Sequence, residues 1–395
     1  METGKRVDAD GPLVWTAVAL LLLGVAIVLD ASSPRAGQSA VTNHNPLYFF
    51  WRQLLWAGLA LATLRAAMVY PFWRVRRYWL AGILASVILL ALVLVPGIGI
   101  EVNGAKRWLG VGPLRFQPSE FAKLAVVVFI AAYSDLWRHR IRDGQRGFLP
   151  PVIAMVVIGA LVAKEDLGTA VCLLTTGLVM IYMAGARGRH LAMLLGLTGL
   201  ALVGFVLMEP YRLDRIKAWL DPWGHYNGPG YQPVHGLLAL GSGGIFGLGI
   251  FLGRQKHLYL PAEHTDYIFC TVGEELGLIG TLGLLVAFAV LIIRGLTIAQ
   301  RTRHWFGALL AGGLTTMLGT QALLNIAVVT GTIPATGVPL PFISYGGSSL
   351  IFTALAMGML LNISQYPNLR DREEGARREV RHRRRGYRRA RLSRA

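Results

Sequence analysis

The sequence predicts an all-α polytopic membrane protein. Of its 395 residues, 54% are hydrophobic and only 15% are charged, and the mean hydropathy is +0.50. Apolar stretches follow one another from Leu13 to Ile363. Because the hydrocarbon core of a bilayer requires about 20 apolar residues per helical crossing, we expect about ten transmembrane helices. A soluble domain of this length would carry considerably more charge.

Ten apolar stretches account for this number. They are Leu13–Leu29, Tyr48–Val69, Trp79–Val95, Phe121–Tyr133, Phe148–Ala163, Leu167–Ala184, Leu191–Met208, Tyr267–Ile293, Phe306–Val329 and Gly347–Ile363. The fourth and fifth are short, so either could recruit flanking residues or re-enter the membrane without crossing it. Between the seventh and the eighth, residues 210–266 are expected to form a long extracytoplasmic loop.

Arginines are distributed unevenly over the connecting loops, and this predicts the orientation. The alternate loops that carry most of them hold Arg74, Arg76, Arg77, Arg138, Arg140, Arg142, Arg146, Arg187, Arg189, Arg294, Arg301 and Arg303. The positive-inside rule places these loops, and with them both termini, in the cytoplasm. The chain then divides into a cytoplasmic N-terminus (1–12), a transmembrane domain (13–363) and a basic cytoplasmic tail (364–395).

The net charge of +18 does not by itself indicate a nucleic-acid partner. The tail alone holds twelve arginines against four carboxylates. A basic stretch directly after a last membrane helix is typical of contact with anionic lipid head groups, so we expect no nucleic acid. The two cysteines, Cys172 and Cys270, lie in or beside apolar spans and have no metal-binding spacing. The sequence contains no Walker-type phosphate loop, and we expect no nucleotide.

Ionisable residues mark the outer ends of several spans. Glu120 and Lys123 follow Pro118, which favours a helix start, and their spacing places them on one helix face. They could neutralise each other at the membrane boundary, or they could face a cavity that serves a site.

Asp266 stands immediately before the apolar run that begins at Tyr267. It could complement the dipole of the following helix, or it could place a carboxylate at the mouth of a cavity. Deeper in the same span lie Glu274 and Glu275, of which a continuous helix would aim only Glu274 toward the Asp266 face. Cations in the preceding outer loop, such as Arg212, would suit a diphosphate.

A strip rich in glycine and proline, Gly337–Ser349, follows the ninth span. Its prolines hold the chain extended and its glycines permit close backbone approach. Ser348 and Ser349 could cap the last helix. We expect a rigid outer loop that lines a site.

Several long motifs then occur in an order that resembles one family. They are Gly104-Ala105-Lys106-Arg107-Trp108-Leu109, Arg115 to Glu120, Asp166-Leu167-Gly168-Thr169-Ala170, His264 to Phe269, Gly273 to Gly277 and Pro339 to Ser349. Together they resemble the SEDS family (shape, elongation, division and sporulation), whose branches include FtsW, RodA and SpoVE. The segments Tyr48 to Gln53 and Gly358 to Ser364, with the arginine-rich tail, are most similar to the FtsW division branch. Lys164-Glu165 and Tyr267 are mild departures.

The resemblance implies a ten-helix bundle and a peptidoglycan glycosyltransferase. Such an enzyme polymerises lipid II into β-1,4-linked glycan strands at the outer face of the bacterial cytoplasmic membrane, here during septal wall synthesis. Asp266 matches the catalytic aspartate of the family and is expected to act as the base on the acceptor hydroxyl. The residues expected to bind substrate are Lys123, Glu120, Arg107, Lys106, Gln117, Arg212, Arg215, His264, Glu274, Ser344 and Ser348.

The expected chemistry sets a requirement on this base. An aspartate at its ordinary pKa is a weak base for an alcohol. We therefore expect either a raised pKa at Asp266 or a nearby divalent cation, Mg²⁺ or Mn²⁺, whose ligands the sequence leaves open.

The sequence leaves alternative functions open and indicates partner proteins. The same cavity would also suit a lipid II flippase, a RodA-type elongation polymerase or a scaffold without chemistry. The family resemblance implies a class B penicillin-binding protein, a transpeptidase, as partner, together with other membrane proteins of the division complex. Small residues allow close helix approach, so we expect the transpeptidase on the ninth span, near Ala308 and Gly312, or on the neighbouring eighth span.

Overall fold

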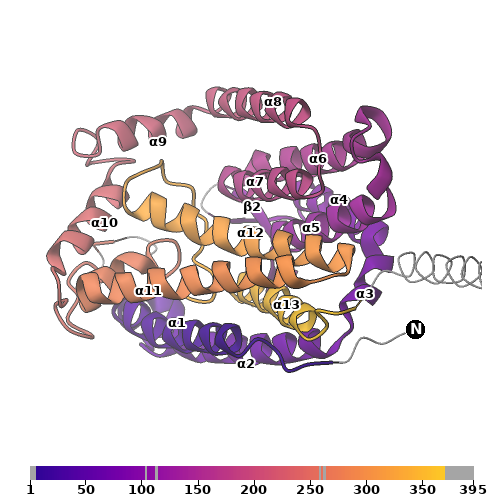
Figure 1. Ribbon diagram of the computed structural model, residues 1–395. Helices are drawn as coiled ribbons and strands as arrows, with labels where there is room; N and C mark the ends of the chain where they lie inside the picture. The colour runs from indigo at the N-terminus through magenta and orange to yellow at the C-terminus, as the bar shows by residue number, and fades with distance from the viewer. Residues whose placement is uncertain (1–5, 103–104, 112–113, 258, 261–263, 370–395) are drawn as a thin grey trace, which may run out of the picture.

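The computed structural model is a bundle of long helices with shorter elements at its two ends (Figure 1). It describes residues 6–102, 105–111, 114–257, 259–260 and 264–369. The larger part of the expected basic tail, residues 370–395, lies outside the described residues. Ten helices overlap the ten expected spans: α1 (Gly11–Gln38), α2 (Tyr48–Val69), α4 (Trp79–Leu94), α5 (Pro118–Leu136), α6 (Leu149–Glu165), α7 (Leu167–Met183), α8 (Gly188–Leu207), α11 (Ile268–Arg301), α12 (Trp305–Val329) and α13 (Gly347–Ser364).

Length and composition support the membrane assignment. Within the described residues, seven helical segments are long and apolar enough to cross a bilayer: Gly11–Gln38, Phe72–Leu94, Gly144–Glu165, Gly188–Leu207, Ile268–Arg301, Trp305–Val329 and Gly347–Ser364. The helices α2, α5 and α7 are shorter or more polar. The fold class expected from the sequence, a polytopic all-α membrane protein, is confirmed. The remaining short helical elements are α3 (Phe72–Val75), η1 (Ala40–Thr42), η2 (Arg76–Tyr78), η3 (Arg138–Arg140) and η4 (Gly144–Phe148).

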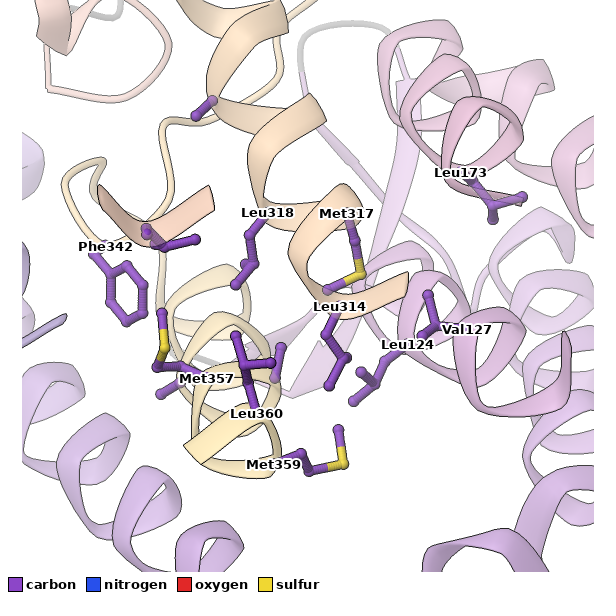
Figure 2. Packing of buried hydrophobic residues seen from close by; sticks show 14 of the residues in the cluster. Leu124, Val127, Leu173, Leu314, Met317, Leu318, Phe342, Met357, Met359 and Leu360 are labelled. Carbon is purple, nitrogen blue, oxygen red and sulfur yellow. The ribbon is translucent and has the colours of Figure 1, made fainter. Parts of the chain in front are cut away.

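The centre of the bundle is formed by α12, which packs between α5, α7, α11 and α13. Figure 2 shows Leu314, Met317 and Leu318 of α12 near Leu360 of α13 and Leu124 of α5, all of them buried. Lipid tails are as apolar as leucine, so close packing rather than water exclusion holds such helices together.

Glycines allow this packing to be close. A Cβ atom at Gly312 would overlap the side chain of Met183, and one at Gly313 would overlap Met180. Gly312 and Gly313 therefore face α7 inside the bundle. The expectation that Gly312 is available to a partner helix is wrong, because α7 already occupies that face.

One end of the bundle contains the first and last described segments and loops expected to be cytoplasmic. Val7 N donates to Gln365 O at 2.9 Å, and Phe72 N donates to Asn362 Oδ1 at 2.9 Å. The Arg138 guanidinium lies over the Trp305 ring, 4.3 Å from its centre. The first and last described segments thus meet at one end, as an even number of crossings requires.

The outer segment expected as a loop contains two helices, α9 (Pro210–Leu220) and α10 (Tyr231–Ser242). In Figure 1, α9 continues the line of α8 along one edge, and α10 lies at the end of the bundle opposite the label N. The segment after α10 then inserts into α11.

The helix α11 is broken at Gly277, which has a φ of +65°. Leu278 N donates to Gly244 O at 2.9 Å, while Leu248 N donates to Glu274 O at 2.9 Å. The inserted segment thus satisfies backbone groups that the break would leave without partners, as burial in a membrane protein demands. The glycine run after α10 is explained by this insertion, since a Cβ at Gly243 would overlap the backbone of α11.

A small antiparallel sheet follows α4 and precedes α5 in the chain, and the sequence did not predict it. Its strands are β1 (Ile100–Val102), β2 (Ala105–Val111) and β3 (Leu114–Phe116), in the order β1-β2-β3. Ile100 pairs with Trp108, and Gly110 pairs with Arg115. The sheet holds Lys106 and Arg107 on its middle strand.

The two ends of the bundle give a test of orientation. We expect cysteines introduced at the exposed positions Arg142 and Arg303 to react with a membrane-impermeant maleimide only in inverted vesicles. A cysteine at the exposed position Gly228 should react only in intact cells or right-side-out spheroplasts. Labelling of the Gly228→Cys variant from the cytoplasmic side would contradict the orientation.

Candidate active site

Asp266 lies at the entrance of α11, in a short segment that the rest of the outer end holds in place. Asn325 of α12 donates its Nδ2 to Asp266 O and to Val338 O, both at 2.8 Å. Ser344 donates its Oγ to Thr265 O at 2.6 Å. The backbone on both sides of the Asp266 carboxylate is thereby fixed to the strip that follows α12.

Arg107 of β2 and Gly337 of that strip are neighbours of the Asp266 carboxylate. A Cβ atom on Gly337 would lie 3.4 Å from Asp266 Oδ2 and 3.9 Å from Arg107 Nη1. Arg107 is itself held by a bond from its Nε to Glu165 O at 2.7 Å. The sheet, the α6–α7 turn and the α12–α13 strip therefore bring a carboxylate and a guanidinium to the same point.

Burial makes the Asp266 carboxyl a stronger base than usual. The pKa of Asp266 is raised to about 6, first by burial and then by the charge of Asp166, while Arg107, Arg215 and His264 oppose the rise. A general base works best when its pKa lies near the working pH. The expected rise is thus present at the position where the sequence analysis placed the base.

Lys123 and Glu120 form a buried ion pair on α5. Lys123 Nζ lies 2.9 Å from Glu120 Oε1 and donates to Gln321 Oε1 at 2.8 Å. Gln321 in turn donates to Pro339 O at 3.0 Å. An uncompensated charge here would be costly, so this network ties α5 to the strip beside Asp266. The ion pair agrees with the first alternative, mutual neutralisation, while a role of the pair in substrate binding stays a prediction.

The serines of the strip act as braces between segments. Ser344 Oγ also accepts from Leu340 N at 2.8 Å. Ser348 accepts from Gln117 N at 3.3 Å and donates to Arg115 O at 3.1 Å. Gly346, with no side-chain cap, precedes α13. The expectation that Ser348 caps the last helix is wrong, because its hydroxyl is bonded to the chain around β3 and α5.

The two arginines of α9 lie in different surroundings. Arg212 is buried, and its guanidinium donates to Phe205 O, Ala163 O and Lys164 O. These carbonyls occupy its donors and make it a brace between α6, α8 and α9 rather than a free cation for a diphosphate. Arg215 is exposed, donates to Ala335 O at 3.2 Å, and is one of the cations that act on Asp266.

Glu274 does not face Asp266. Its carboxylate accepts from Arg254 N at 2.7 Å and from Gln255 N at 3.2 Å. The neighbouring Glu275 accepts from Phe251 N and Gly253 N. The continuous-helix argument does not apply because Asp266 precedes the first residue of α11, Ile268, and both glutamates hold the inserted segment. These contacts place Glu274 against the inserted segment and not in the expected substrate site.

A narrow cleft opens beside Arg107. Its lining includes Lys106, Arg107, Glu165 and Asp166 on the polar side, and α4 and α6 supply Leu90, Val93 and Leu161 on the apolar side. Its accessible volume is about 20 Å³, room for one water molecule. In this arrangement the cleft is too narrow for a sugar ring.

Three polar residues of this region have contacts that the sequence did not predict. Asp166 belongs to one of the family motifs, but no function was predicted for it, and none was predicted for Gln321 and Asn325 within the ninth span. The spacing of Gln321 and Asn325, four residues apart on one face of an apolar helix, was a signal that could have found them.

A preformed divalent metal site is not evident. In the described part of the chain, no group of three or more His, Cys, Asp and Glu side chains is arranged to hold a metal ion. Glu165 and Asp166 are the carboxylates that line the cleft, and the guanidinium of Arg107 beside Asp166 disfavours a second cation there.

Comparison with known proteins identifies the family. The model of the cell cycle protein family FtsW/RodA/SpoVE matches residues 12–369. Stage V sporulation protein E of Bacillus subtilis (strain 168) is 41% identical over 366 residues, covering 92% of this chain and 99% of the relative. A probable peptidoglycan glycosyltransferase FtsW of Geobacter sulfurreducens is 41% identical over 357 residues, covering 90% and 95%. The chain belongs to the FtsW/RodA/SpoVE family.

Solved structures agree with this assignment. A chain from a structure that describes the coordination of polymerization and crosslinking by a peptidoglycan synthase complex superposes with a TM-score of 0.73 at 30% identity, covering 91% of this chain and 98% of that chain. The rod shape determining protein RodA of Thermus thermophilus superposes with a TM-score of 0.66 at 28% identity, covering 91% and 98%. The fold described above is the fold of this family.

The contact between Asp266, Arg107 and Gly337 gives a prediction. Gly337→Ala places a methyl group against Asp266 Oδ2 at a residue whose φ is +75°. The strained backbone costs about 1–3 kcal/mol, and relief of that strain shifts the chain beside Asp266 and Arg107. We expect glycan polymerisation to fall about ten-fold or more. The matched control is Gly331→Ala, which has a φ of +72° and only the Leu237 side chain nearby. Equal activity losses in the two variants would contradict a specific role for Gly337.

Proposed function

We propose that this protein is a peptidoglycan glycosyltransferase that polymerises lipid II into β-1,4-linked glycan strands at the outer face of the bacterial cytoplasmic membrane. The single observation that carries the proposal is the Asp266 carboxyl, whose pKa is raised to about 6 at the outer end of the bundle, beside Arg107. The names of the relatives support the same activity.

The chemistry requires one displacement with inversion. Asp266 removes the proton from the 4-hydroxyl of the acceptor sugar, and the resulting oxygen attacks C1 of the donor sugar. The bond between C1 and the diphosphate oxygen breaks, and the polyprenyl diphosphate leaves with the electron pair. The proton remains on Asp266 until solvent removes it. General-base help of this kind contributes about 10²–10⁴ in rate.

The leaving diphosphate needs cations that are not already saturated. Arg107 and Lys106 lie at the cleft, and the exposed Arg215 acts on the same region. Fixed cations that meet a developing negative charge stabilise the transition state. Lys123 is bonded to Glu120 and Gln321, so we assign it the positioning of α5 and the strip rather than direct contact with phosphate.

The expected divalent cation stays a prediction of its own. Phosphate oxygens are hard ligands that suit Mg²⁺, and we propose that such an ion arrives with the diphosphate of the substrate. Excess EDTA should then slow polymerisation, and restored Mg²⁺ or Mn²⁺ should reverse the loss. Unchanged polymerisation rates in EDTA would contradict a role for the cation.

Substitution of the base tests the activity. We expect purified Asp266→Asn protein to lose polymerisation of labelled lipid II by about 10²-fold or more, while its elution from a sizing column stays unchanged. The matched control is Asp214→Asn, an exposed aspartate that pairs with Lys217 on α9. The wild type should form strands in detergent, where no second leaflet exists. If it forms none there, the polymerase assignment fails and a flippase becomes the better explanation.

A transpeptidase partner would supply cross-linking of the glycan strands. We propose that its single membrane helix docks on α11, because Gly312 and Gly313 of α12 are buried against α7. The exposed side chains of α11 include Leu278, Ile279, Leu282 and Val286. They continue into the exposed Phe246 of the inserted segment. We further propose that the pair works with other division proteins at the septum.

The α11 surface can be tested against a competing face. Gly283 of α11 is exposed with open space around it, as is Gly199 of α8. We expect Gly283→Phe to reduce co-purification of a co-expressed class B penicillin-binding protein several-fold, because a large side chain prevents close helix approach. Gly199→Phe should leave it unchanged. The reverse result would move the interface to α8.

A further inference from the structure

Asp166 is a buried aspartate next to the proposed base, and the mechanism above gives it no role. It precedes α7 as the N-cap residue and is only 4% exposed. Its Oδ1 accepts from Thr169 N at 3.0 Å, and its Oδ2 accepts from Thr169 Oγ1 at 2.8 Å. Capping alone would not require an aspartate, since asparagine caps a helix equally well.

Arg107 connects Asp166 with Asp266. Its Nη1 lies 4.0 Å from Asp166 Oδ2, and the same Nη1 lies at the Gly337 position beside Asp266 Oδ2. The guanidinium cannot move freely between the two, because its Nε is bonded to Glu165 O. One fixed cation therefore pairs with Asp166 and also acts on Asp266 through its charge.

The charged and titratable groups around Asp266 come from several elements. Arg107 faces it from β2, Arg215 from α9, His264 and Tyr267 from its own segment, and Asp166 from the α6–α7 turn. Behind Asp166, Lys123 and Glu120 of α5 form an internally neutral pair. Among these groups, Asp166 brings negative charge near Asp266, whereas Arg107, Arg215 and His264 bring positive charge.

We propose that Asp166 is a positioning residue whose negative charge makes Asp266 a stronger base. Asp166 repels the ionised form of Asp266. It also pairs with Arg107, so that Arg107 neutralises the charge of Asp266 less completely. The assignment rests on the proposed function, because it matters only where Asp266 accepts a proton during the reaction. It explains why an aspartate caps α7 at this place.

The sign of the effect follows from the charges. A nearby like charge disfavours ionisation, so Asp266 keeps its proton to higher pH when Asp166 is ionised. Polymerisation requires the ionised base, and the rate should rise with pH through the pKa of Asp266. Removing the charge of Asp166 lowers that pKa, which moves the acid limb of the pH–rate profile to lower pH. The plateau falls as well, because a weaker base transfers the proton less readily.

The test compares the pH dependence of kcat in three proteins. For Asp166→Asn we expect the midpoint of the acid limb to move down by about half a pH unit, so that the rate at pH 5, relative to its own plateau, rises about three-fold. Thr169→Val is the matched control, because it removes a hydrogen bond to Asp166 and keeps the charge. Its midpoint should not move. A midpoint that stays in place or moves up in Asp166→Asn overturns the proposal.

A measurement without substrate covers the case in which Asp166→Asn is inactive. The protonated Asp266 carboxyl absorbs in the infrared as a C=O stretch, and subtraction of the Asp266→Asn spectrum isolates it. Its titration midpoint should be lower in Asp166→Asn than in the wild type and in Thr169→Val. Equal midpoints overturn the proposal whatever the activity. A lower midpoint in Asp166→Asn, together with a wild type that makes no glycan, would instead remove the proposed function.

Discussion

The requirement that buried backbone groups find partners without water governs the outer half of this molecule. At the break in α11, Leu278 and Ile279 lose their helical acceptors and bond instead to the segment after α10. Glu274 and Glu275 then bind four backbone N–H groups of the same segment. Irregular backbone at membrane depth is stable only when protein supplies such partners. The inserted segment, the paired glutamates and the run of glycines are therefore one arrangement.

A similar requirement, that buried charges find partners, determines the arrangement of the site. Buried ions require partners, and the outer end supplies them in linked sets: Lys123 with Glu120, and Arg107 with Asp166 and Asp266. Polar side chains of α12 connect both sets to the strip around Gly337. The site is thus assembled from β2, α5, the α6–α7 turn, α12 and the α11 entrance, which are far apart in the sequence. A displacement in any of them would alter the surroundings of Asp266.

The sequence predicts the helices well, because apolar length is a local signal, and the place of Asp266 at the entrance of a helix is a local signal too. Residue roles that depend on distant contacts were harder to predict. Arg212 had the charge for a diphosphate, but three carbonyls from α6 and α8 bind it. Glu274 was assigned on the assumption that Asp266 belongs to the same helix, but α11 begins at Ile268. The sheet that holds Arg107 was missed because its strands are short and polar.

The helix α11 connects the proposed partner surface with the site. Asp266 stands at its entrance, the break at Gly277 follows, and the exposed stripe that begins at Leu278 continues from the break. Because the inserted segment bonds to Leu278 and Ile279, a helix docked on this stripe would contact α11 beyond the break and the inserted segment beside it. The same segment is held by Glu274 and Glu275 from the part of α11 before the break. The proposed partner surface and the entrance that carries Asp266 are therefore connected through one helix and the segment bonded to both of its halves.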